Sequence, residues 1–230
     1  MTLWSREEMK LLAIDTSTDY LSLAVMDGDR ALARVHRKAP RAHSSRLMPM
    51  IGRVLKAAKT PLKKLDGFAI SIGPGSFTGL RIGVVTVKGL AYAAKKPIVA
   101  VPTMDAIAEN AANFRGIICV ALDARKNKVY AGIYKSDGRR VKRVSKFLLI
   151  PVPELLKRLA AYDSVTLLGD YAEKIGGLLP KSVVAAVSWQ PTPEIVGRLG
   201  IELFNKGKFT DVEDLEPFYI YTRECDITGK

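Results

Sequence analysis

A glycine-rich run from Ile72 to Gly83 combines residue types that could bind an anion. It reads IGPGSFTGLRIG and lies between a strand pattern and a helical pattern. Such a turn points backbone N–H groups outward at the start of a helix, where phosphates and carboxylates bind. The run lacks the motif of a phosphate loop and that of a dinucleotide fold. The same glycines also suit a tight turn with Thr78 as the helix cap, so both interpretations stay open. The candidate anion-site residues are Gly73, Gly75, Ser76 and Thr78.

Two aspartates occupy matching places in the two halves of the chain. Asp15 and Asp123 each end the first strand pattern of their half, and each is followed by a polar turn. In two-lobed phosphotransfer proteins such an Asp and turn hold a metal-bound nucleotide, and the turn usually contains a glycine. Here Ser17 takes that place in the first turn, and the second turn also lacks a glycine. The two aspartates and Ser17 are candidate nucleotide-site residues, although Asp15 could equally serve only to stabilise its turn.

Histidine and cysteine are scarce, which argues against several kinds of catalytic site. His36 and His43 are seven residues apart and have no partner histidine, so we expect no metal site. No Ser-His-Asp or Cys-His arrangement is indicated, and we expect no catalytic residues. Two cysteines, Cys119 and Cys225, favour a reducing compartment over a disulfide framework. With no signal peptide and no apolar run long enough to span a bilayer, we expect a cytoplasmic protein with no membrane partner.

The elements that must position these residues follow one order twice. Each half reads as three strands, helix, strand, helix, strand, helix, with an Asp-Gly hairpin signal at Asp27 and Gly28. This order predicts two related α/β lobes, each with a mixed five-stranded sheet and flanking helices. We place the first lobe at residues 9–104 and the second at 105–230, with 1–8 as an N-terminal extension. In the first lobe we expect helices at 45–59 and 78–95, the first capped by Ser44 or Ser45 with Pro49 near its first turn.

The net charge is concentrated in the first lobe. The chain has 36 Lys and Arg against 23 Asp and Glu, a formal net charge of +13. Residues 30–104 contain 15 of these basic residues and one acid, Asp66. A solvated basic face would explain this pattern, and so would a docking surface for an acidic partner or for nucleic acid.

The helical pattern around Leu47 carries an apolar stripe with basic residues on both sides. The stripe fits the core of the lobe, as such stripes commonly do. Met48 and Met50 widen it, however, and methionine suits adaptable contacts with a partner.

Five segments in order resemble the bacterial TsaB (YeaZ) family, once labelled glycoprotease-like. They are LLAIDTSTDYLSLAV, AHSSRLMPMI, ISIGPGSFTGLRIGVVTVKGLA, PIVAVPTMDAIA and ALDARKNKVYAGIY, and they cover about Met9 to Tyr134. The resemblance implies a two-lobed actin/Hsp70/sugar-kinase-like fold. It also implies a role in making N6-threonylcarbamoyladenosine at tRNA position 37, as a non-catalytic relative of the catalytic subunit TsaD.

The resemblance further implies the partners of this chain. They are a TsaD-like subunit, a TsaE-like ATPase that joins the pair, a second copy when the chain is alone, and tRNA indirectly or weakly. The expected interface is formed by two first-lobe helices. Its core would be Leu47, Met50, Ile51, Val54, Leu55, Leu80, Val84, Val87 and Ala91. We expect no cofactor on the chain itself, while a nucleotide at an interface of the complex stays open.

Departures from the pattern of the catalytic relatives fit a non-catalytic role. Those proteins hold a metal with an HxxxH pair, whereas here Leu47 stands four residues after His43. At Asn127 and Lys128 the sequence differs from the family's usual small-then-acidic pair, so a contact made by that acid is not carried over to this chain. Two alternatives remain, a sugar-kinase-like phosphotransferase that uses Asp15 and Asp123, and a basic tRNA-binding module.

Overall fold

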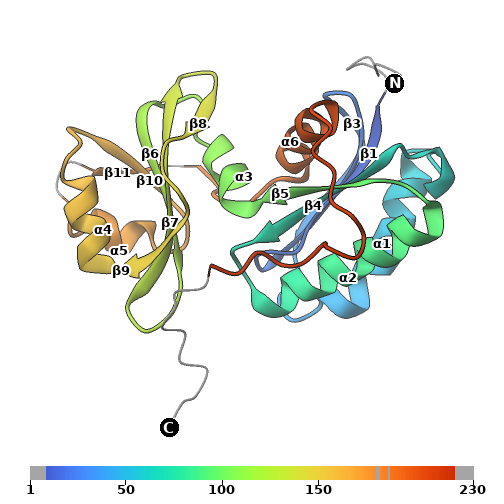
Figure 1. Ribbon diagram of the computed structural model, residues 1–230, viewed down its shortest axis with the longest axis horizontal. Coiled ribbons are helices and arrows are strands. Elements are labelled where there is room, and N and C mark those ends of the chain that lie inside the picture. The colour runs from blue at the N-terminus through green and yellow to red at the C-terminus, as the bar shows by residue number, and fades with distance from the viewer. Residues whose placement is uncertain (1–8, 180–181, 186, 221–230) are drawn as a thin grey trace, which may run out of the picture. The chain divides into compact units, whose positions relative to one another are not determined.

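The computed structural model of the chain describes residues 9–179, 182–185 and 187–220 (Figure 1). Two compact units make up this part of the chain. The first comprises residues 9–106 and 190–218, and the second comprises 107–189 and 219–220. Residues 1–8, the expected N-terminal extension, lie outside the described residues. No helix in the described part of the chain is long and apolar enough to cross a membrane.

The first unit contains the expected five-stranded mixed sheet, in the order β3-β2-β1-β4-β5. Its strands are β1 (Lys10–Asp15), β2 (Tyr20–Asp27), β3 (Arg30–Lys38), β4 (Gly67–Gly73) and β5 (Ile98–Pro102). The first three pair antiparallel through hairpins, β4 pairs parallel with β1, and β5 pairs parallel with β4. Gly28 takes a positive φ of 55° in the turn between β2 and β3, as the Asp-Gly signal predicted. The parallel strands require crossovers, which helices supply.

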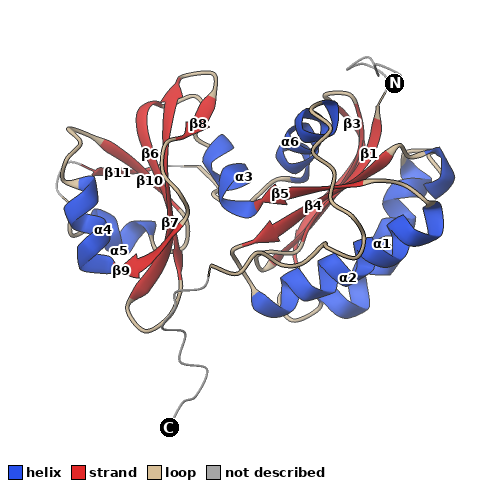
Figure 2. Cartoon of the chain, viewed as in Figure 1, coloured by secondary structure: helices blue, strands red, loops and turns tan. Residues whose placement is uncertain are grey.

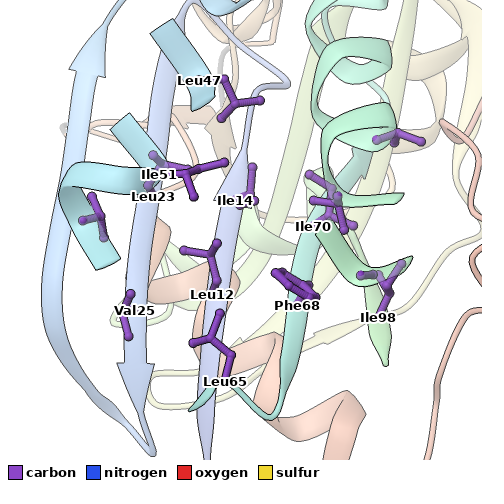
Figure 3. Close-up of a cluster of buried hydrophobic side chains, with 14 of the residues drawn as sticks. Leu12, Ile14, Leu23, Val25, Leu47, Ile51, Leu65, Phe68, Ile70 and Ile98 are labelled. Carbon is purple, nitrogen blue, oxygen red and sulfur yellow. The ribbon is translucent and has the colours of Figure 1, made fainter. Parts of the chain in front are cut away.

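Helices cover both faces of this sheet (Figures 1 and 2). On one face lie α1 (His43–Ala57) and α2 (Phe77–Ala94), which contact each other and β1 to β4. A short 3-10 turn, Leu62–Lys64, precedes β4. Figure 3 shows Leu47 and Ile51 directed from α1 toward Leu23 and Ile14 of the sheet. The main core of the unit therefore lies between these two helices and the sheet.

Helix α6 (Pro193–Asn205) covers the other face, which corrects the expected lobe boundary. It lies late in the chain but contacts β1, β2, β4 and β5 of the first unit. The helix approaches the sheet closely at Gly200, where a Cβ would lie 2.4 Å from the Cβ of Ala69. Only a residue without a side chain fits there. Residues 190–218 therefore belong with the first unit, not with a lobe at 105–230.

The starts of α1 and α2 differ from the expected caps. α1 begins at His43 with Ala42 before it and no side-chain cap, and Pro49 lies inside the helix. The His43 ring anchors this start, with Nε2 3.2 Å from the carbonyl oxygen of Tyr20. In α2 the cap is Ser76, whose Oγ accepts from the Gly79 N–H at 3.3 Å, and not the expected Thr78.

The second unit repeats the strand order of the first with one strand more. Its sheet runs β11-β10-β6-β7-β8, and β9 also pairs with β7. The strands are β6 (Arg115–Asp123), β7 (Lys128–Asp137), β8 (Val141–Arg143), β9 (Leu148–Pro151), β10 (Val165–Leu168) and β11 (Ser182–Val184). The single strand expected at 141–149 is broken into β8 and β9, and at the break the Ser145 Oγ accepts from the Ile133 N–H at 2.9 Å. The helices are α3 (Thr103–Glu109), which spans the boundary between the units, α4 (Val152–Leu159) and α5 (Ala172–Gly176).

Candidate functional site

The end of β1 holds a buried carboxyl group in a polar turn. Asp15 is fully buried, and its two oxygens accept from Ser17, from the N–H at 3.2 Å and from Oγ at 2.8 Å. Burial raises the pKa of the Asp15 carboxyl to about 6, against smaller lowering effects of Ser71, Ser17 and His43. Asp15 therefore stabilises its own turn, one of the two roles that the sequence left open.

A second buried polar side chain, Ser71, lies beside this carboxyl. It lies on β4, which pairs with β1 in parallel, and its hydroxyl is fully buried. Among the described residues its Oγ has no partner with hydrogen-bond geometry, although its proximity lowers the pKa of Asp15. The site thus places a buried acid and a buried hydroxyl side by side.

The glycine-rich run packs directly onto this turn. The Ser76 N–H donates to the Ser17 carbonyl at 2.7 Å, and Thr16 Oγ1 donates to the Gly79 carbonyl at 2.8 Å. A Cβ at Gly75 would lie 2.4 Å from the Ser17 carbonyl oxygen, and one at Gly79 would lie 2.1 Å from that of Thr16. The two predicted motifs are therefore brought together, and these glycines are required by the close approach of the chain to itself.

The remaining residues of the run have mixed positions. Gly73 has a positive φ of 111°, and its N–H donates to Thr103 Oγ1 at 2.9 Å. Ser76 and Thr78 are exposed at the start of α2. An anion bound at this helix start stays a prediction.

The matching turn in the second unit has a different construction. Asp123 Oδ1 accepts from the Arg125 N–H at 2.8 Å, and the Asp123 N–H donates to Asp170 Oδ1 at 2.8 Å. Burial raises the pKa of Asp170, and the nearby Asp123 charge adds to this effect. Arg125, Lys126 and Asn127 all take positive φ, which no residue of the first turn does. Asp170 was not among the predicted site residues, although it ends the LLGD run that begins in β10.

The residues expected to form the partner interface mostly belong to the core. Seven of the nine are buried, with side chains at most 3% exposed. They are Leu47, Ile51, Val54, Leu80, Val84, Val87 and Ala91. Met50 and Leu55 are partly buried and pack against the same core. Seven of the nine expected interface residues therefore pack in the core of the first unit, because the apolar stripe of each helix faces the sheet.

The same two helices also carry exposed apolar groups outside their buried stripes. Met48 on α1 is 52% exposed, and Phe77, Val85 and Tyr92 on α2 are 53%, 68% and 77% exposed. Gly52 and Gly89 lie inside α1 and α2, and a Cβ on either would meet nothing within 4 Å. These residues, with the exposed Arg46, Arg53, Lys56 and Arg81, are called the α1–α2 outer face below. The sequence had already indicated Met48 as a contact for a partner, and the helical period places Phe77, Val85 and Tyr92 outside the buried stripe of α2.

The two histidines are structural in the described part of the chain. The His36 ring stacks on Tyr20 with centroids 4.7 Å apart, and its Nδ1 lies 2.9 Å from Ser22 Oγ. Burial lowers the pKa of His36. Among the described residues no group of three or more His, Cys, Asp or Glu could hold a metal ion.

Comparisons with known proteins place the chain in a family. Residues 35–182 match the family model described as TsaD, tRNA N6-adenosine threonylcarbamoyltransferase. The tRNA threonylcarbamoyladenosine biosynthesis protein TsaB of Escherichia coli is 28% identical over 92% of this chain and 94% of its own length. The TsaB of Bacillus subtilis is 29% identical over 95% of this chain and 96% of its own length.

A solved structure agrees with these relatives. YeaZ from Pseudomonas aeruginosa superposes with a TM-score of 0.78 at 28% identity, over 92% of this chain and all of the other. Both units carry the repeated strand order expected for an actin/Hsp70/sugar-kinase-like protein. The chain belongs to the TsaB (YeaZ) family of tRNA threonylcarbamoyladenosine biosynthesis proteins, within the wider threonylcarbamoyltransferase family whose model it matches.

Proposed function

We propose that this chain is a non-catalytic subunit of the complex that makes tRNA threonylcarbamoyladenosine, and that it binds a TsaD-like transferase through the α1–α2 outer face. The TsaE-like ATPase joins that pair, and a second copy of the chain occupies the same face when the transferase is absent. The observation that carries the proposal is the set of four large hydrophobic side chains exposed on two adjacent helices. Exposed apolar groups gathered on one face with a polar rim mark protein interaction sites.

The charge of this face favours an acidic partner. Arg46, Arg53 and Lys56 lie exposed on α1, and Arg81 lies over the Phe77 ring on α2 with its guanidinium carbon 4.0 Å from the centroid. Basic groups around an apolar centre speed association with an acidic surface and disfavour a basic one. We therefore expect the transferase to present acidic residues around an apolar contact.

Two features support a non-catalytic role. The turn after Asp15 has no glycine, and its Ser17 carbonyl is already bonded to the Ser76 N–H of the chain itself. The Asp15 carboxyl, which would have to hold a metal-bound nucleotide, is fully buried and bonded to Ser17. We propose that neither a nucleotide nor a metal binds at this turn.

Val85→Glu tests the interface. Its side chain is 68% exposed, so the variant should fold, while a carboxylate in a desolvated contact should cost about 2 kcal/mol or more, roughly thirtyfold in affinity. Val183→Glu is the matched control, because Val183 is 56% exposed on β11 of the second unit. Co-purification with the TsaD-like subunit should be lost for the first variant and kept for the second. Equal co-purification of both would refute the interface.

ATP turnover by the isolated chain tests the non-catalytic assignment. We expect no hydrolysis above the buffer rate and no change in Asp15→Asn. Turnover that disappears in Asp15→Asn would instead support the phosphotransferase. In both tests circular dichroism confirms that the variants are folded.

A further inference from the structure

The second unit has a basic region of its own. Residues 115–147 contain ten Lys or Arg and two Asp, a net charge of +8. The net charge of the residues outside 30–104 does not reveal this region, because acidic residues elsewhere in the chain offset its basic residues. The chain therefore has two separate basic segments, and the α1–α2 outer face explains only the first.

The fold gathers part of this charge at one end of the sheet. Lys135 on β7 lies directly opposite Lys142 on β8, and Arg115 on β6 pairs with Asp137 on β7. The Arg115 side chain lies at the hairpin turn, since a Cβ at Gly138 would be 3.1 Å from its Cγ and Nε. The exposed basic residues here are Arg115, Lys135, Arg139, Arg140, Lys142 and Arg143, and we call them the β7–β8 basic surface.

Two lysines of this surface lie directly opposite each other on neighbouring strands. Like charges directly opposite on antiparallel strands are destabilising, as for Lys135 and Lys142. Asp137 is the acid in the hairpin, and its Oδ1 accepts from the N–H groups of Arg139 and Arg140 at 2.8 Å each. These bonds lower the pKa of Asp137 and commit its carboxylate to the turn. Within the described residues neither Lys135 nor Lys142 forms an ion pair.

The character of the surface favours nucleic acid over a protein. Val144 is the large hydrophobic side chain exposed beside it, whereas the α1–α2 outer face exposes four. Phe147 is partly buried under the Arg143 guanidinium, 3.9 Å from its centroid. Protein contacts need an apolar centre, while phosphates are bound by solvated Lys and Arg. We infer that the β7–β8 basic surface binds the sugar–phosphate backbone of the tRNA on which the complex acts.

This contact would position the tRNA and would not read its sequence. Contacts to phosphate fix orientation and carry no base information. Its signature is a strong dependence on salt, because each neutralised phosphate releases counterions. A triple variant, Arg139→Gln with Arg140→Gln and Lys142→Gln, removes three charges and keeps the backbone N–H groups that bond Asp137.

Fluorescence anisotropy with unmodified tRNA, titrated at several salt concentrations, tests the inference. The triple variant should bind about tenfold or more weakly at 0.1 M salt, with a salt slope lower by about 2–3. The matched control is Arg46→Gln with Arg53→Gln and Lys56→Gln, which removes three charges from α1. The control should keep tRNA binding and weaken the TsaD-like pairing, and the β7–β8 variant should do the reverse.

Three results would overturn the inference. They are no tRNA binding by the parent chain at low salt, an equal loss of tRNA binding in both triple variants, and loss of the protein partner instead of tRNA in the β7–β8 variant. The second would mean that net charge alone matters, and the third would make this surface a protein contact. Unchanged circular dichroism of both variants shows that the differences do not come from unfolding.

Discussion

Gly52 and Gly89 are exposed glycines inside helices, and replacing them by alanine should stabilise the chain while weakening its partner binding. A glycine in a helix costs about 0.8–1.0 kcal/mol relative to alanine. Apart from the neighbouring residues and backbone of its own helix, nothing lies within 4 Å of a Cβ placed at either position, so packing in the described part of the chain does not require a glycine there. A partner helix that approaches closely would require it, because a methyl group would fill the contact.

The expected gain in stability follows from these positions. Gly52→Ala and Gly89→Ala lie on different helices, so their effects should add to about 2 kcal/mol. For a chain of this size that corresponds to a rise in Tm of about 4–8 °C. Urea unfolding followed by circular dichroism measures the free energy of unfolding of each variant. Gly79→Ala is the opposite control, because its Cβ would lie 2.1 Å from the Thr16 carbonyl oxygen and should destabilise the chain.

The same variants should bind the TsaD-like subunit less tightly. Extra methyl groups in a packed contact cost about 1–3 kcal/mol, roughly five- to 150-fold in Kd. Surface plasmon resonance with the purified proteins measures the Kd of each variant for the TsaD-like subunit. If Gly52→Ala and Gly89→Ala stabilise the chain but leave the Kd unchanged, close packing at the outer face is wrong. If they destabilise the isolated chain, the helices are not exposed there.

Two further predictions concern charge. The pKa of Asp15 is raised from 3.8 to about 6 in the folded chain, so its ionisation lowers stability by roughly 3 kcal/mol as the pH rises from about 4 to above 6. The free energy of unfolding of Asp15→Asn, measured in urea and compared with that of the parent chain, should therefore be higher at pH 7.5 than at pH 4. A difference between variant and parent that does not change with pH would contradict the burial argument. A homodimer through the α1–α2 outer face brings like charges together, and added salt screens their repulsion because it shortens the Debye length. Analytical ultracentrifugation should therefore show a tighter homodimer at about 0.5 M salt than at about 0.05 M salt. A homodimer that dissociates with salt would refute this.

The strands and helices of the fold could be predicted because local chemistry determines them. The hairpin at Gly28 and the glycine turn at Gly73 both take the positive φ that their sequences indicated. The break between β8 and β9 could not be predicted, because the contact at the break joins Ser145 to the Ile133 N–H, twelve residues away in the sequence. The hydrophobic pattern alone predicts one continuous strand over residues 141–149.

The placement of α6 shows a different limit. Its apolar period predicts a helix with one buried face but does not say which sheet that face covers. The decisive fit is three-dimensional, since Gly197 and Gly200 allow contact with Met26 and Ala69 of the first sheet. The same limit applies to the residues expected at the interface, because the helical period identifies which residues share a face and not whether that face points inward.

The glycine-rich run connects the buried turn to the partner surface. In a nucleotide-binding turn a glycine lets backbone approach phosphate, whereas here Gly75 and Gly79 let α2 approach the carbonyls of Ser17 and Thr16. This contact fixes the start of α2 on a buried part of the sheet, and the exposed Val85 and Tyr92 follow on the same rigid helix. The glycine-rich run, which resembles an anion site in sequence, therefore fixes the position of α2 and so the position of the exposed residues at the proposed interface.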